Sequence, residues 1–519
     1  MMTSSVFADL PLGIAGPIIA LLLLLLSKSL WTKTSRLSLP PGPRPLPLIG
    51  NLHQVPKSLQ WLQFYRWSRE YGPVMHLSMA GQPLILLSTN QAAQDLLSRR
   101  SAQYSDRPRM VMSGSSLHQR MEAPLLNVRA SSCYRPIQEM ESRQLLFDII
   151  EDTKTHGDKG VDFHHHFERG LASIIYSGYR LRTGHEPSLQ AAKRVQAEFA
   201  RTGQVGAYLV DSFPVLNKLP GFLAPWKREG AQLYELERDL HHMADSAEAR
   251  GMATEELAFD LGIVADAALD TSTVAMDWLV VACITAGAGA GGFVAKAQAD
   301  LDRVVGRGRL PTFEDRARLP YIDAIVNEVL RWRPVVVGGV PHATKKENTY
   351  MGYRIPAGSL VMGNHYAITR DESVFGADVD AFQPERWLQY PDGHESPAAI
   401  DHEQCTLRDL PQTGFGFGRR ICTGRNIARN GLFIQMARLL WAFDIEAGVS
   451  ETTGKRVVVD DMDCTEGFVT MPKPFRASFR PRGDWVRDIV AAQCDTHGED
   501  HVAILDQAGR ERRVTIGKE

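Results

Sequence analysis

Cysteine is scarce in this chain, which holds only six among its 519 residues. The six are far apart in the sequence, and no two of them form a CxxC pair. This spacing excludes a disulfide framework and argues against a structural zinc site, and it favours a reducing compartment. The chain also lacks a charge imbalance, because its formal net charge is −2, and it has no long basic cluster. We therefore expect no nucleic-acid partner.

Internal repeats and long low-complexity linkers are absent as well. Length alone would suggest about three domains, but without such linkers one large domain is the better prediction. The glycine-rich stretch 285–292 is short, and we expect it to be a loop that follows a helix.

The amino terminus departs from globular composition, because residues 10–27 carry no charge. As a helix this stretch would be roughly 27 Å long, close to the thickness of a bilayer core. Basic residues follow it and only Asp9 precedes it, so the positive-inside rule leaves the rest of the chain in the cytosol. We predict a short lumenal segment at 1–9 and a single uncleaved anchor at 10–27, in the endoplasmic reticulum membrane.

Residues 28–52 are basic and proline-rich, and we expect them to form a semi-rigid spacer between membrane and folded domain. The domain itself is expected over 53–485, followed by a charged tail at 486–519. Helical periodicity dominates, and short β-type runs add small sheets. The expected helices are 138–155, 254–285, 293–306, 320–332 and 425–443, and the expected β runs are 82–88, 350–358 and 359–363. The predicted fold class is mainly α with small β sheets.

One cysteine lies in an unusual loop, FGFGRRICTG at 415–424, ahead of an apolar stretch with helical spacing. A metal-binding cysteine must be a thiolate, which a helix amino terminus and nearby cations favour. No second cysteine or histidine is close in sequence to Cys422, which argues against zinc. A cofactor that supplies the other ligands itself is required, and heme with an axial thiolate meets that requirement.

This loop resembles the heme-binding loop of the cytochromes P450, whose pattern FxxGxRxCxG is met at Phe415, Gly418, Arg420, Cys422 and Gly424. The resemblance implies heme b as cofactor, with Cys422 as the axial ligand of the iron. It implies that Arg420 pairs with a heme propionate and that Phe415 packs beside the loop. The alternative is a buried structural cysteine beside surface arginines.

A second motif of that family is ExxR, met here by Glu328 and Arg331 on a helix that Pro334 ends. Alone, such a pair is equally a solvated ion pair. The family places a PERF-like segment next, matched by the PERW at 384–387, and then the cysteine loop. The resemblance implies that Glu328, Arg331 and Arg386 form a buried charge network.

The stretch 254–285 carries four aspartates, so we reject it as a second membrane span. Asp266, Asp270 and Asp277 fall on one helix face, and a solvated stripe is expected for Asp266 and Asp277. AALDTS at 267–272 resembles the family's oxygen-activation motif, which implies that Asp270 relays protons and Thr271 positions water. Ala268 replaces the usual glycine of that motif.

Two histidine features leave alternatives open. His342 is a candidate partner of a heme propionate and equally an ordinary histidine with its hydrogen bonds satisfied. The run His164–His166 is not expected to bind metal, because adjacent histidines on a helix point about 100° apart. The apolar run 335–344 lies, by resemblance, against the substrate pocket and suggests an apolar substrate.

The resemblance covers about residues 40–485. Within the family, the chain is similar to filamentous-fungal members of secondary metabolism. Two regions depart from the family pattern. Between residues 106 and 134 no tryptophan is present, and only Arg120, Arg129 or His118 could replace the family's propionate-binding pair. The stretch 228–252 is short for the helices that roof the substrate site.

The resemblance implies a membrane-anchored monooxygenase that uses O₂, takes electrons from NADPH through NADPH-cytochrome P450 reductase, and oxidises an apolar small molecule. Two alternatives remain. The first is a heme-binding protein that lacks turnover because of the shortened segments. The second is a heme-thiolate isomerase or dehydratase that needs no reductase.

Overall fold

The structure, a computed structural model, describes residues 37–107, 131–175, 214–240, 254–287, 291–388 and 413–493, together with 194, 208, 210 and 289. Side chains at 214, 215, 233–240, 254–266 and 413 are left out of the description. The predicted anchor at 10–27 therefore lies outside the described residues.

The amino-terminal third of the described chain contains a short sheet and the first helices. Its elements are α2 (Gln60–Tyr71), β1 (Val74–Met79), β2 (Gln82–Leu87), α3 (Asn90–Ala93), η2 (Gln94–Arg99), α4 (Ser101–Tyr104), α7 (Arg135–His156), η3 (Gly157–Lys159) and α8 (Phe163–Ile175). The element η2 is a π-helix, and the other η elements are 3₁₀ helices.

The middle of the chain is helical. It contains η4 (Pro214–Lys218), η5 (Gly221–Leu223), α11 (Pro225–Leu240), α12 (Thr254–Thr285), α13 (Phe293–Val304), η7 (Phe313–Arg318) and α14 (Pro320–Trp332). The last third is mixed. It contains β3 (His342–Ala343), β4 (Asn348–Tyr350), β5 (Tyr353–Ile355), β6 (Leu360–Gly363), α15 (His365–Ile368), α16 (Glu372–Phe375), η8 (Pro384–Trp387), η10 (Thr413–Phe415), η11 (Gly418–Arg420), α18 (Arg425–Ala442), β7 (Phe443–Ala447), β8 (Ala477–Pro481) and α19 (Asp484–Gln493).

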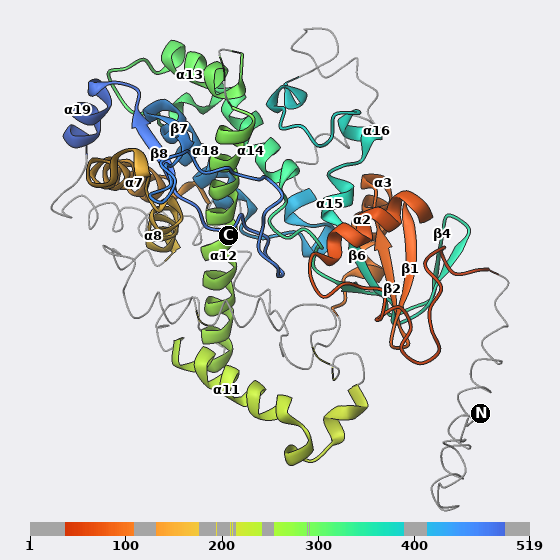
Figure 1. Ribbon diagram of the computed structural model, residues 1–519. Helices are drawn as coiled ribbons and strands as arrows, with labels where there is room; N and C mark the ends of the chain where they lie inside the picture. Colours follow the sequence, from red (N-terminus) through yellow and green to blue (C-terminus); the bar gives the residue numbers. More distant parts are fainter. Residues whose placement is uncertain are drawn as a thin grey trace, which may run out of the picture.

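The main core surrounds α12, which runs through the middle of the molecule with α7, α8 and α18 on one side and the sheet on the other (Figure 1). From Val274 to Ala282 every apolar side chain of α12 is buried, so this stretch packs on all sides. In the described part of the chain, Ala267–Thr285 is the one stretch long and apolar enough to cross a membrane, and 72% of that window is buried. Such burial is that of a core helix, in line with its rejection as a membrane span.

The largest sheet has strand order β1-β2-β6-β3. Strands β1 and β2 form an antiparallel hairpin, β2 pairs in parallel with β6, and β3 pairs antiparallel with β6. The run Leu84–Leu87 is apolar throughout because both faces of β2 are covered. The single β run expected at 350–358 is instead part of a hairpin formed by β4 and β5. The chain turns at Met351 and Gly352, which take left-handed φ angles of 49° and 78°.

The spacer expected at 28–52 is wrong for its described part. Residues 40–52 pack against β1, where Pro41 O accepts from His76 N (2.9 Å) and Asn51 Oδ1 accepts from Ser78 N (2.8 Å). Gly50 also forms a bridge with Met79. The prolines thus shape an edge of the domain, since their extended backbone offers carbonyl acceptors to the first strand.

The boundary expected at 485 is also wrong. Helix α19 crosses it, and Val486 and Val490 are buried in the main core. At the end of α19, Gln493 O accepts a hydrogen bond from Arg143 of α7 (3.4 Å). The folded domain therefore extends at least to Gln493.

Candidate active site

The loop of Cys422 joins η11 to α18, the helix that begins at Arg425. The Cys422 backbone N–H donates to Phe415 O (2.8 Å), which closes the loop, and Arg425 donates to Cys422 O (3.1 Å). The Cys422 side chain is exposed, whereas the other three described cysteines are buried. Its sulfur is therefore accessible to a ligand, three residues ahead of a helix amino terminus that favours negative charge.

Glycine at 418 is required by close packing. Gly418 has a φ of 57°, and a Cβ there would lie 2.1 Å from Leu97 O of the π-helix η2. An L side chain would thus meet both backbone strain and a clash. This contact fixes the Cys422 loop against the segment that leads to Arg107.

Three basic side chains from distant parts of the chain gather beside this loop. Arg107 donates to Pro341 O (2.7 Å) and Val340 O (3.1 Å), Arg420 donates to Ser105 O (2.8 Å), and His342 Nδ1 donates to Tyr104 O (2.7 Å). Burial and the charge of Arg420 lower the pKa of Arg107 to about 10, so it stays charged at neutral pH. Among the described residues no carboxylate pairs with Arg107 or Arg420, and Arg107 Nε is buried without a partner. The site is suited to an anion that brings more than one oxygen acceptor.

His342 adds little charge to this cluster. Burial and the charge of Arg107 lower its pKa to about 4, so the imidazole is neutral. Its Nδ1 carries the hydrogen because a carbonyl oxygen only accepts, which leaves Nε2 without a proton in the neutral ring. Donation to a propionate would need a second proton at Nε2, so that role of His342 stays a prediction.

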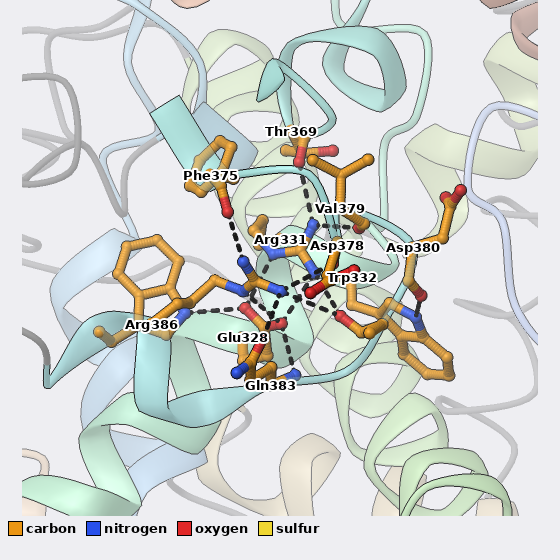
Figure 2. A network of polar contacts seen from close by, with 12 residues as sticks. Glu328, Arg331, Trp332, Thr369, Phe375, Asp378, Val379, Asp380, Gln383 and Arg386 are labelled. Carbon is orange, nitrogen blue, oxygen red and sulfur yellow. Dashed lines mark hydrogen bonds and ion pairs between the residues drawn. The ribbon is translucent and has the colours of Figure 1, made fainter. Parts of the chain in front are cut away.

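Glu328, Arg331 and Arg386 come together in a buried network, shown in Figure 2. Glu328 Oε1 accepts from Arg331 (2.7 Å), Arg386 (3.0 Å) and Gln383 N (2.8 Å), while Oε2 accepts from Arg331 (2.8 Å) and Trp387 Nε1 (2.9 Å). The two arginines donate onward to backbone carbonyls of Thr369, Phe375, Asp378, Val379 and Ala381. The network therefore fastens the segment 369–387 to α14, which in turn contacts η10 at the start of the Cys422 loop.

The two residues expected to handle oxygen and protons both lie on α12. Thr271 Oγ1 donates to Ala267 O (2.7 Å), one turn earlier, and the helix is continuous from Thr254 to Thr285. The Asp270 side chain is partly buried. Alanine at 268 fits this unbroken helix, since a glycine there would weaken it.

Arg107 is not among the site residues expected from the sequence. Its acceptors are 233 and 234 residues away, so only the fold reveals that it faces the same place as Arg420. The candidates Arg120, Arg129 and His118 lie outside the described residues, as does the side chain of Asp266.

Comparison with known proteins identifies the family: the cytochrome P450 model matches residues 40–131 and 226–479. The chain is similar to the cytochrome P450 monooxygenase FrzL of a Cladobotryum species, at 35% identity with 92% of this chain and 94% of that protein covered. It is also similar to the cytochrome P450 monooxygenase aneD of Aspergillus aculeatus, at 37% identity with 86% and 88% covered. The chain belongs to the cytochrome P450 family, and the predicted enzyme class is confirmed.

Membership implies a heme iron held by a cysteine thiolate, and the described residues fit that cofactor. Cys422 presents an exposed sulfur, and within the described part of the chain Arg107 and Arg420 have no carboxylate partner. A porphyrin carries two propionates, which are anions of the kind that such a pair accepts.

Proposed function

We propose that this protein is a heme-thiolate monooxygenase that inserts one oxygen atom of O₂ into an apolar organic substrate. The observation that carries the proposal is the exposed Cys422 sulfur beside Arg107 and Arg420, neither of which pairs with a carboxylate of the described residues. In this assignment Cys422 binds the iron, and Arg107 and Arg420 hold the propionates. His342, which is neutral without the cofactor, becomes a third partner when the propionate charges raise its pKa and Nε2 takes up a proton. Phe415 closes the loop through its carbonyl, and Gly418 keeps a side chain away from Leu97 O. A Cβ at Gly424 would lie 3.9 Å from the Cys422 sulfur, which is ordinary contact.

When bound, a thiolate-ligated heme supplies the site for O₂ reduction with two electrons from NADPH, so that one oxygen enters the substrate and the other leaves as water. Two protons are consumed in that balance, one of them carried by NADPH as part of its hydride. The chain's task is to deliver them. The Thr271 hydroxyl donates its hydrogen bond to Ala267 O, so its oxygen can accept a hydrogen bond from a water and hold that water in place. The partly buried Asp270 carboxyl can then pass protons to the water.

Electrons are proposed to come singly from NADPH-cytochrome P450 reductase. The protein is proposed to lie in the endoplasmic reticulum membrane, with its catalytic domain in the cytosol. Exposed apolar side chains support contact with lipid. They lie in two groups, Leu46, Leu48 and Ile49 near the start of the described chain and Phe222 and Leu223 in η5. Fungal relatives such as FrzL and aneD support a place in fungal secondary metabolism.

An apolar substrate is proposed from the run 335–340. Val335 and Val337 are buried in the main core, whereas Val340 remains 40% exposed, and Arg107 binds its carbonyl. The run 335–340 thus extends from the core to Arg107 and Arg420. Its apolar side chains offer a surface that a hydrocarbon skeleton can contact.

Replacing Thr271 by alanine is expected to uncouple the enzyme. NADPH is still consumed, but the product formed per NADPH falls by about tenfold or more, and peroxide accounts for the difference, because water is no longer held for proton delivery. Reductase, NADPH and substrate are mixed with holoprotein, and NADPH, product and peroxide are measured together.

Thr273→Ala is the matched control, since Thr273 lies on the same helix and makes the same kind of bond, to Leu269 O (2.9 Å). Equal coupling in wild type and Thr271→Ala would remove the role of Thr271. Absence of NADPH consumption in the wild type would favour the heme protein without turnover, and product formation without reductase would favour the isomerase or dehydratase.

A further inference from the structure

His164 on α8 and Asp277 on α12 form an ion pair that the proposed chemistry does not use. His164 Nδ1 lies 2.7 Å from Asp277 Oδ2. The Asp277 side chain is only 3% exposed, whereas His164 is 39% exposed. The solvated stripe expected at Asp277 is therefore wrong, because α8 covers that face of α12.

The carboxylate depends on the imidazole for its charge balance. Burial raises the pKa of the Asp277 carboxyl, and the hydrogen bond from His164 works against that rise. Burial alone would lower the pKa of His164, but the hydrogen bond to Asp277 and its charge raise it to about 9. At neutral pH the imidazole is protonated and donates to a buried carboxylate, whose Oδ1 has no hydrogen-bond partner among the described residues.

Among the described charged groups around the pair, His164 is the cation that balances the charge of Asp277. On its own segment two acidic residues, Asp162 and Glu168, add to the rise of its pKa. On α7 the facing carboxylates have other partners: Asp152 pairs with His156 and His166, and Glu141 and Asp148 pair with Arg169. No other cation of the described residues forms an ion pair with Asp277.

Apolar packing alone specifies the rotation of α12 poorly, because from Val274 to Ala282 it is apolar nearly all round and buried on all faces. Two directional contacts interrupt that surface. One is Asp277 to His164, and the other is Trp278 Nε1 to Thr470 O (3.0 Å). Adjacent helical residues point about 100° apart, so the two contacts together define one rotation about the axis.

The rotation of α12 about its axis also sets the direction of the proposed proton-handling residues. Asp270 precedes Asp277 by seven residues, a rise of about 10 Å and a turn of only about 20° from the same face. The helix is unbroken between them, so it transmits its rotation as a rigid element.

We propose that the pair His164 and Asp277 is a pH-dependent clamp that fixes α12 against α8 and thereby positions Asp270 and Thr271. The clamp rests on the contact itself, whereas its consequence for oxygen chemistry rests on the proposed function. His164 and Asp277 are positioning residues, since they act through the helix.

The first test measures hydrogen exchange of residues 267–285 and thermal unfolding of the full-length holoprotein. His164→Ala and Asp277→Asn are compared with His166→Ala. His166 is also on α8, but its Nε2 contacts Asp152 Oδ2 on α7 (3.1 Å) and not α12. Exchange in 267–285 is expected to rise severalfold in the first two variants and to stay at the wild-type level in the control. At neutral pH, His164→Ala should lower the unfolding midpoint by about 3 °C, because it leaves a buried carboxylate unpaired.

The pH dependence has a defined sign. The folded-state pKa of His164 lies above its ordinary value of 6.5, so its contribution is complete below about pH 6.5 and is lost as the pH rises through about 9. The difference in midpoint between wild type and His164→Ala should therefore vanish at alkaline pH, while His166→Ala retains the alkaline loss seen in wild type. Unchanged exchange in 267–285 together with an unchanged pH profile in His164→Ala would overturn the clamp.

The second test uses product formed per NADPH in the backgrounds of wild type and Asp270→Asn. If the clamp acts through Asp270, His164→Ala lowers this ratio severalfold in the wild-type background and has no further effect in Asp270→Asn. An equal loss in both backgrounds would overturn the positioning role. If wild type forms no product, the proposed monooxygenase function fails, and the exchange and pH measurements still decide whether the clamp exists.

Discussion

Glu328→Gln is expected to abolish folded, heme-loaded protein. The Glu328 carboxylate is fully buried and accepts five hydrogen bonds, including those of two buried arginines. A glutamine turns an NH₂ group toward these donors and leaves Arg331 and Arg386 with no negative charge. Breaking a buried ion pair costs about 3–5 kcal/mol, and two pairs share this carboxylate, whereas a whole domain is stable by about 5–15 kcal/mol.

The yield of soluble holoprotein and its urea unfolding midpoint measure this loss. Glu372→Gln is the matched control, because Glu372 is 49% exposed and pairs with Arg69, itself 60% exposed, so its loss should cost about 1 kcal/mol or less. A folded Glu328→Gln protein with the midpoint of Glu372→Gln would show that the network does not hold the fold.

Arg107→Leu is expected to weaken heme retention by about 10- to 100-fold, the effect of losing one charged hydrogen-bonding partner of a propionate. Arg107 is held in place by Pro341 O and Val340 O and faces the same site as Arg420, and no carboxylate of the described residues pairs with either one. Leucine preserves bulk but removes every donor. Of the two arginines that the structure describes at this site, Arg420 then remains.

Heme loss is followed by transfer to an excess of apomyoglobin, with unfolding measured separately so that a folding defect is recognised. Arg99→Leu serves as control, because Arg99 is 63% exposed and pairs with Asp95. Equal rates of heme loss in wild type and Arg107→Leu would mean that Arg107 does not bind the cofactor.

The helices of the main core could be predicted from the sequence, because their apolar spacing is long and regular. The stretch 254–285 matches α12 at both ends, and 320–332 matches α14, where Pro320 begins the helix and Pro334 follows its end. Family resemblance placed Glu328, Arg331 and Arg386 in one network, and the structure brings them together although Arg386 is 58 residues from Glu328.

Contacts between distant segments could not be predicted in the same way. Periodicity placed Asp277 on a polar face, but it does not show that α8 covers that face and supplies His164. Proline content suggested a free spacer, whereas residues 40–52 bind β1 through their carbonyls. Arg107 and Arg420 come from distant segments, and the close approach of Gly418 to Leu97 O of η2 is one of the contacts that bring these segments together.

The central claim, that Cys422 holds the iron as a thiolate, is tested most directly by the absorption spectrum of the reduced full-length holoprotein under carbon monoxide. The wild type is expected to show the strongly red-shifted Soret band of thiolate ligation, and Cys422→Ser is expected to lose it. A heme-loaded Cys422→Ser protein that kept the wild-type band would contradict the account, as would a heme-loaded wild type without it.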